Sequence, residues 1–289
     1  MGALNYLCLL FLLRDALWLI AIFSGKIISV VHGQTTARPL PGLVSNWNWE
    51  QTTTLLIAGL AGSLMSYGVY QARKRPKVVE VSVPIAGLPE ALAGLRIVQI
   101  SDLHAGPTIR RAFVQRVVDL VNALQADIIA FTGDVADGSV AHLRPEVAPL
   151  AELSAGYGKF FVTGNHEYYS GAEAWIEEMR RLGFAVLMND NKILQIQKRR
   201  VLIAGVTDFS AGHMLRQHQT EPAQALASAE NCEVKILLAH QPRSVFAAAQ
   251  YDCDLQLSGH THGGQFWPWQ WLVPLQQPYV AGLFKHEKT

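Results

Sequence analysis

"LRIVQISDLH", at residues 95–104, joins a short run of branched apolar residues to a polar cluster with an aspartate and a histidine. The same succession recurs along the chain: "DIIAF" precedes "TGD", "KFFV" precedes "TGNHE", "KILLA" precedes "HQP", and "DLQL" precedes "SGHTH". Continuous apolar runs of this length predict strands that are buried on both faces. We therefore expect an α/β fold with a β-sheet core flanked by helices on both faces.

Helical segments are expected between the strands. "IRRAFVQRVVDLVNAL", at residues 109–124, has its apolar residues at helical spacing, and "AEAWIEEMRRL", at residues 172–182, predicts a second helix. In sheets of this type, ligands bind beyond the carboxyl ends of the strands. All five polar clusters lie at those ends, so one fold can bring them together. Turn chemistry would explain their glycines, but it would not explain a metal-type donor after every strand.

Composition limits the class of protein. The formal net charge of +1 over 289 residues gives no basic excess, so we expect no nucleic-acid binding. The length allows one sizeable domain with an addition, or two small domains. Three cysteines, Cys8, Cys232 and Cys253, share no CxxC spacing and predict free thiols in a reducing compartment.

The N-terminal part of the chain is strongly apolar. Residues 52–70 carry no charge and are long enough to cross a hydrocarbon core of ~30 Å. The basic run "QARKRPK" follows at once and predicts that everything after it faces the cytoplasm. Residues 3–23 are a second candidate span, although Arg14 and Asp15 interrupt it at a cost of roughly 2.5–3.5 kcal/mol each.

These features divide the chain into two parts. We expect residues 1–76 to form a membrane anchor of one or two transmembrane helices with a basic linker, in the inner (plasma) membrane. An anchor is favoured over a cleaved signal peptide, because the N-terminal region has no basic segment. Residues 77–289 then form the soluble domain. It is predicted to open with a strand at "VVEVSVPI", residues 78–85, where apolar and polar residues alternate.

The polar clusters supply nitrogen and oxygen donors of the kind that divalent transition metals bind. Their number is too large for one tetrahedral ion and suits two ions that share a carboxylate. The candidate donors are Asp102, His104, Asp134, Asn165, His240, His260 and His262. His260 and His262 are one residue apart, and in an extended segment such residues point to the same side.

The series D-x-H, GD, GNHE, H and GHxH, in this order, resembles the calcineurin-like metallophosphoesterases. "GNHEYYSG" and "SGHTHGGQ" resemble the bacterial membrane-anchored branch of that family. The resemblance covers about residues 77–282. It implies two divalent metal ions, such as Mn, Fe or Zn, held in two groups. Asp102, His104 and His262 hold one ion, Asn165, His240 and His260 hold the other, and Asp134 bridges them.

The same resemblance implies an activity, which is the metal-dependent hydrolysis of phosphoesters. It places His166 beside the scissile phosphate, where it donates a proton or stabilises charge. Glu167 is expected to orient a neighbouring group without touching metal. The glycines beside His260 and His262 would allow tight turns near the metals and leave room for phosphate. The family continues beyond "QQPYVAGLF" with a further strand and a glycine-rich loop, so the domain is expected to be short at its C-terminus.

Other residues have weaker signals. Asp208 follows the apolar run "RVLIAGV" and is either an extra ligand or, as we favour, a buried cap. Arg110 and Arg111 could meet a substrate phosphate, but an arginine pair that opens a helix is usually solvated. The aromatic run "QFWPWQWLVPL", at residues 265–275, suits either contact with a membrane surface or a wall packed on the sheet.

The sequence therefore favours a two-metal phosphodiesterase or phosphatase that acts at the membrane surface. Its phosphoester substrates could be lipid-linked. A narrower alternative is a pyrophosphatase for a lipid-linked nucleotide, such as a UDP-2,3-diacylglucosamine hydrolase. A third is a catalytically silent membrane scaffold or sensor. Retention of Asp134, Asn165 and His166 favours an enzyme over the silent form.

Overall fold

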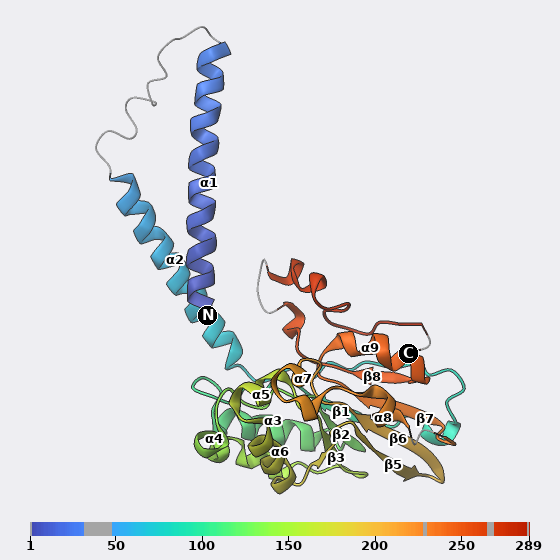
Figure 1. Cartoon of the computed structure of the whole chain (residues 1–289). Coiled ribbons are helices and arrows are strands. Elements are labelled where there is room, and N and C mark those ends of the chain that lie inside the picture. The colour runs from blue at the N-terminus through green and yellow to red at the C-terminus, as the bar shows by residue number, and fades with distance from the viewer. Residues whose placement is uncertain (1, 32–47, 228–229, 265–268, 288) are drawn as a thin grey trace. The chain divides into compact units, whose positions relative to one another are not determined.

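The computed structural model describes residues 2–31, 48–227, 230–264, 269–287 and 289 (Figure 1). The strands are β1 Ile97–Ile100, β2 Ile128–Phe131, β3 Lys159–Phe161, β4 Ala185–Val186, β5 Asp190–Ile196, β6 Arg199–Gly205, β7 Val234–Leu238 and β8 Leu255–Leu257. The α-helices are α1 Gly2–Val31, α2 Trp49–Ala72, α3 Arg111–Ala123, α4 Val140–Val147, α5 Asn165–Ser170, α6 Ala172–Arg181, α7 Ala211–Met214, α8 Pro222–Leu226 and α9 Val245–Ala248. Short 3₁₀ helices are η1 Glu90–Leu92, η2 Ala148–Glu152, η3 Arg216–His218, η4 Pro242–Ser244, η5 Ala249–Tyr251, η6 His262–Gly264, η7 Trp269–Trp271 and η8 Val273–Leu275.

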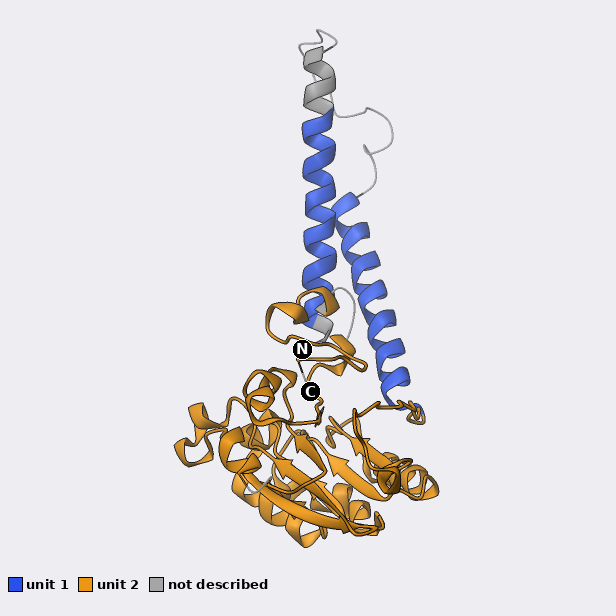
Figure 2. Ribbon diagram, turned by 90° about the vertical axis from the view of Figure 1, so that its right-hand side faces the viewer, with its two compact units in different colours: residues 1–74 blue, residues 75–289 orange. Residues whose placement is uncertain are grey.

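The chain separates into two compact units, Met1–Lys74 and Arg75–Thr289 (Figure 2). The first unit holds α1 and α2, and both helices are long and apolar enough to be candidate membrane spans. The spans are Leu4–Ser24, with a mean hydropathy of 2.1, and Trp49–Ala72, with a mean hydropathy of 1.3. Arg14 and Asp15 form an ion pair of 2.6 Å within α1. The two charges that interrupt the apolar run thus offset each other.

The strands of the second unit form two four-stranded sheets, with the orders β1-β2-β3-β4 and β5-β6-β7-β8. Every pair in the first sheet is parallel. In the second sheet only the β5–β6 hairpin is antiparallel. The sheets follow from the sequence because branched apolar runs pair best when both of their faces are covered.

Alternation along the strands decides what each sheet face contacts. In β2, Ile129 and Phe131 pack in the core formed with α3, α4 and α6, whereas Ile128 and Ala130 pack in the core between the two sheets. In β7, Ile236 likewise joins the core between the sheets, while the next residue packs with α8 and α9. The layers are therefore helix, sheet, sheet and helix. The predicted α/β class, with helices on both faces of a β-sheet core, is confirmed, and the core consists of two packed sheets.

The sequence patterns identified most of the elements correctly. The five strands that precede polar clusters are present, as are the helices predicted at residues 109–124 and 172–182. The strand predicted at residues 78–85 was wrong, because this segment pairs with no strand in the described part of the chain. An alternating pattern makes a strand only where a neighbour and a core accept it. Val79 is 80% exposed, so no core covers that face.

Both sheets direct strand ends to the same edge of the domain. The Gln99 side chain of β1 donates from Nε2 to Thr132 Oγ1 and to the Ser258 carbonyl, each at 2.9 Å. Thr132 follows β2 in the first sheet, and Ser258 follows β8 in the second. This one amide thus ties the carboxyl ends of the two sheets together, where the polar clusters lie.

A glycine at the end of β6 allows the sheets to approach. A Cβ atom at Gly205 would lie 2.6 Å from Val162 Cγ1 and would also collide with Leu187. We expect Gly205→Ala to lower the melting temperature, because overpacking of a dense core costs roughly 1–3 kcal/mol. Near-ultraviolet circular dichroism of the purified chain during heating measures the melting temperature. Gly156→Ala is the control, since its Cβ would meet atoms only at 3.8 Å or beyond. Equal melting temperatures for the two variants would contradict the prediction.

Candidate metal centre

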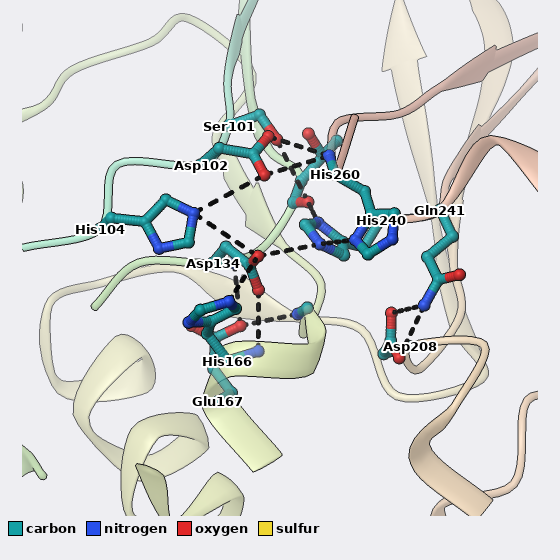
Figure 3. Close-up of polar contacts among 12 residues, drawn as sticks. Ser101, Asp102, His104, Asp134, His166, Glu167, Asp208, His240, Gln241 and His260 are labelled. Carbon is teal, nitrogen blue, oxygen red and sulfur yellow. Dashed lines mark hydrogen bonds and ion pairs between the residues drawn. The ribbon is translucent and has the colours of Figure 1, made fainter. Parts of the chain in front are cut away.

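Five loops at the carboxyl edge of the two sheets bring the predicted donors together (Figure 3). The loop after β1 carries Asp102 and His104, the loop after β2 carries Asp134, the start of α5 carries Asn165 and His166, the loop after β7 carries His240, and the turn after β8 carries His260 and His262. A cleft of about 320 Å³ opens among these side chains. All seven predicted donors and His166 therefore belong to one site region.

The first group consists of Asp102, His104 and His262. Their candidate ligand atoms all lie within 4.8 Å of one another. His262 Nε2 lies 3.3 Å from Asp102 Oδ1 and 3.1 Å from His104 Nε2. This is the set that the family resemblance assigns to one ion.

The second group consists of Asp134, His240 and His260, which also meet within 4.8 Å. His240 Nε2 lies 3.1 Å from Asp134 Oδ2 and 3.3 Å from His260 Nδ1. Asn165 lines the same cleft. Its Oδ1 is buried and accepts no hydrogen bond from any residue that the structure describes. A buried acceptor without a partner is costly, and a bound cation would satisfy it.

The backbone at the donors is strained. Asp102, His104, Asp134, His260 and His262 have φ values of 54°, 48°, 56°, 71° and 48°, in the left-handed region. Such conformations cost of order 1–3 kcal/mol each and persist only where the surroundings impose them. His260 and His262 were expected to point to the same side because an extended segment was predicted, and this reason was wrong. They reach the same cleft through left-handed turns.

Two glycines leave room for candidate ligand carboxylates. A Cβ atom at Gly164 would collide with the Asp134 side chain, and one at Gly259 would collide with Asp102 and Ser101. The first lies before α5 and the second before His260. The glycines of "TGNHE" and "SGHTH" therefore allow close approach of carboxylates and backbone.

Charges in the second group are arranged to hold a cation. Burial by itself would raise the pKa of Asp134, but the hydrogen bond and charge of His240 lower it to about 2. Burial would likewise lower the pKa of His240, but Asp134 raises it to about 10. Positive charge at this point is thus stabilised by the carboxylate. A metal ion that binds His240 replaces the proton of the charged imidazole.

Glu167 lies beneath the site and is fully buried. Its carboxylate accepts hydrogen bonds from the amides of Asp134 at 2.9 Å, Val135 at 2.8 Å and Gly164 at 2.6 Å. Burial and the charge of Asp134 raise its pKa above the usual value, while the three amide donors favour the ionised form. Glu167 thereby fixes the loop after β2 to the start of α5.

Asp137 is a site residue that the sequence reasoning missed. Its Oδ1 lies 2.7 Å from His104 Nδ1 and 2.7 Å from His166 Nδ1. Burial alone would raise the pKa of Asp137, but hydrogen bonds with the two histidines lower it well below its usual value. The signal available in the sequence was its place in "TGDVADG", three residues after Asp134.

The residues with weaker signals lie around this centre. Asp208 is buried and accepts a hydrogen bond from the Ser210 amide at 2.8 Å, and Ser210 is the N-cap residue of α7. Its carboxylate also accepts from Gln241 Nε2 at 3.0 Å (Figure 3). Arg110 pairs with Glu146 at 3.0 Å, and the Arg111 amide donates to the same carboxylate. These arginines thus lie on a solvated surface.

The aromatic run is described only in part, because residues 265–268 lie outside the described residues. Trp271, Leu272 and Leu275 are exposed, which differs from a wall packed on the sheet.

The donors fit divalent metal ions. Imidazole nitrogens and carboxylate oxygens suit Zn, Mn and Fe, and the unpartnered Asn165 oxygen lines the same cleft. The backbone is left-handed at five of the candidate donors, and their ligand atoms gather in two groups. The residues of this chain thus form a candidate site for divalent metals.

The family model described as calcineurin-like phosphoesterase matches residues 95–264, which is more than half of the chain. A transmembrane protein with metallophosphoesterase domain from Danio rerio is 37% identical over 269 residues, covering 90% of this chain and 60% of the relative. A protein of the same description from Bos taurus is 34% identical over 296 residues, covering 99% of this chain and 64% of the relative. The chain thus spans less than two thirds of the length of these curated relatives.

Among solved structures, a 5'-nucleotidase precursor from Thermus thermophilus is similar, with a TM-score of 0.42 and 17% identity, over 58% of this chain and 42% of that chain. The match to the family model covers the strands and loops that carry every candidate donor. The chain therefore belongs to the calcineurin-like phosphoesterase family.

Proposed function

We propose that the protein is a two-metal-dependent hydrolase of phosphoester bonds that works at a membrane surface. The position of Asp134 carries this proposal. Its Oδ2 lies 3.1 Å from His240 Nε2 and 3.7 Å from His104 Nε2, between the two groups of donors. A carboxylate shared by two dications offsets their repulsion at the ~3.5–4 Å separation that two-metal sites use.

The proposed ligands follow the two groups. Asp102, His104 and His262 hold one ion, Asn165, His240 and His260 hold the other, and Asp134 bridges them. Divalent ions, when bound, activate water at neutral pH and neutralise charge on a phosphoryl group. Glu167 contributes by holding the loop of Asp134 in place through three backbone amides.

His166 is proposed as the proton donor for the leaving group. Its Nδ1 lies 2.7 Å from Asp137 Oδ1, so that Nδ1–H donates to the Asp137 carboxylate. The other ring nitrogen, Nε2, then lies 4.0 Å from Asp134 Oδ2. The hydrogen bond to Asp137 raises the pKa of His166 above its usual value, against the opposing effect of burial. The protonated form of His166 is thereby favoured, and its side chain lines the cleft. General acid catalysis of this kind contributes roughly 10²- to 10⁴-fold.

The membrane part of the proposal rests on the first unit. Residues 1–76 are proposed as the anchor and basic linker, and residues 77–289 as the catalytic domain. The two apolar helices support the anchor. The basic run "RKRPK" at residues 73–77 supports a catalytic domain on the cytoplasmic side of the inner (plasma) membrane.

Asp134 tests the two-metal site. The purified wild-type chain is expected to retain two divalent ions, and Asp134→Asn is expected to lose ions from both positions, because the neutral amide no longer offsets the repulsion between the two ions. After incubation with Mn²⁺ or Zn²⁺ and gel filtration, inductively coupled plasma mass spectrometry gives the ratio of bound metal to protein. Asp119→Asn, which changes an exposed carboxylate of α3, is the matched control and should bind as the wild type does. Full metal content in Asp134→Asn would rule out the bridging role.

His166 separates an enzyme from a silent scaffold. His166→Ala should leave metal content unchanged while kcat falls by roughly 10²-fold or more. The loss should be smaller for nitrophenyl esters than for alkyl esters, because nitrophenolate leaves with little help from an acid.

His260→Ala is the comparison for this experiment, since it should lower metal content and activity together. Equal metal loss in the two variants would make His166 a ligand. A wild-type protein that binds both metals and cleaves no phosphoester would favour the scaffold.

Reporter fusions can show on which side of the membrane the domain lies. Green fluorescent protein fused after Lys77 should fluoresce, and alkaline phosphatase at the same point should stay inactive, because "RKRPK" resists translocation. Replacement of the basic residues at 73, 74, 75 and 77 by glutamine should weaken this preference. Active alkaline phosphatase in the unaltered fusion would place the domain on the opposite side.

A further inference from the structure

An exposed apolar surface follows the turn that carries His260 and His262. Trp271, Leu272 and Leu275, on η7 and η8, are 65%, 47% and 81% exposed. We call these three residues the apolar rim. Single exposed apolar residues are ordinary, but large ones gathered in so short a segment indicate an interaction site.

The apolar rim is fixed to the metal centre at both ends. On the first side, Gly264 of η6 lies against Gln270, where a Cβ atom would collide. On the second, buried Gln277 donates from Nε2 to Gln241 Oε1 at 2.9 Å and accepts at Oε1 from the Arg243 amide at 3.2 Å. Gln241 is the residue after the candidate ligand His240. The rim is thus part of the folded edge of the domain and not a frayed end.

A further bond joins the segment after the rim to the turn with the histidines. The Thr261 hydroxyl, which lies between His260 and His262, donates to the Val280 carbonyl. Leu283 and Phe284 follow in this segment and are also exposed. Apolar side chains therefore continue along the chain that borders the candidate metal ligands.

The chain itself indicates what covers the rim. Helix α2, a candidate membrane span, ends at Ala72, and the second unit begins at Arg75. Lipid is thus present at high effective concentration near the second unit in any membrane that α2 crosses. Tryptophan and leucine are suited to the boundary between headgroups and acyl chains. The basic run at residues 73–77 attracts anionic headgroups.

We propose that the apolar rim enters the interfacial region of the lipid bilayer and turns the cleft of the metal centre toward phosphoesters held in the membrane. The first part concerns lipid contact alone. The second part rests on the proposed phosphoester hydrolysis and names its substrate class, an amphiphile whose phosphoester lies at the bilayer surface.

Lipid contact is tested without any activity measurement. The full chain carries a nitroxide label at Leu275→Cys and is reconstituted in vesicles of phosphatidylethanolamine and phosphatidylglycerol. Cys8 and Cys232 are replaced by serine, whereas Cys253 is buried and its thiol pKa is raised to about 11 by burial, so it stays unlabelled. Electron paramagnetic resonance then measures collisions of the label with oxygen, which partitions into lipid, and with a nickel chelate, which stays in water.

Tyr157→Cys is the matched label position. Tyr157 is 37% exposed and precedes β3, so it lies at the opposite edge from the metal centre. We expect a gain of oxygen collisions and a loss of nickel collisions at position 275 relative to position 157. Equal access of the nickel chelate at both positions would place the rim in water and overturn the proposal. Low access of both reagents at position 275 would mean that protein covers the rim, and would overturn it equally.

The orienting part is tested with a double variant, Leu272→Glu with Leu275→Glu. We expect kcat/KM on an acyl-chain nitrophenyl phosphodiester in the same vesicles to fall roughly tenfold, because two leucines no longer enter lipid. Hydrolysis of a water-soluble nitrophenyl phosphate should be unchanged, since neither residue is a candidate ligand. Tyr157→Glu, which adds charge at the opposite edge, should leave both activities unchanged.

An equal loss on both substrates would overturn the orienting role. A wild-type chain that cleaves neither substrate would refute the proposed hydrolysis and, with it, the substrate class. The spin-label result would still decide whether the rim contacts lipid.

Discussion

The carboxylate of Asp134 is buried where the two sheets meet, and the rest of the site is built around its charge. Such a charge is costly unless it is paired and accepts hydrogen bonds. His240 Nε2 approaches its Oδ2 to 3.1 Å from the second sheet, and the His166 amide donates to its Oδ1 at 2.9 Å from the start of α5. The position of one side chain thus requires the ends of β2, β3 and β7 to stay in register.

The left-handed backbone of the donors depends on the same register. The Asp102 amide donates to the Gly133 carbonyl at 3.1 Å, the His104 amide to the Asp134 carbonyl at 3.1 Å, and the Gly259 amide to the His240 carbonyl at 2.9 Å. Each of these bonds joins one ligand loop to the next. The energy that holds five strained residues comes from the packed sheets behind them, since strain persists only where the surroundings impose it. A rigid core is therefore what presents the donors together.

The sequence predicted the strands and the meeting of the candidate donors at one edge, because both depend on local pattern. An apolar run followed by a polar cluster predicts a strand and a loop that carries candidate donors, whatever packs on the other face of the sheet. The second sheet could not be predicted in this way, since a strand such as Ile128–Phe131 is apolar on both faces whether a helix or another sheet covers it. Asp137 was missed because its role depends on two histidines that come from different loops. The strand expected at residues 78–85 failed because alternation does not supply a partner.

The carboxyl edge joins two surfaces of opposite chemistry. The cleft is lined by imidazoles and carboxylates, while Leu275 of the apolar rim is largely exposed. A small soluble phosphoester would engage only the polar part, and the apolar rim would then remain in water without compensation. The proposed amphiphile would engage both parts at once. Because Gln277 and Thr261 fix the rim to the loops of the candidate ligands, the depth of the apolar contact would also set the height of the cleft above the headgroups.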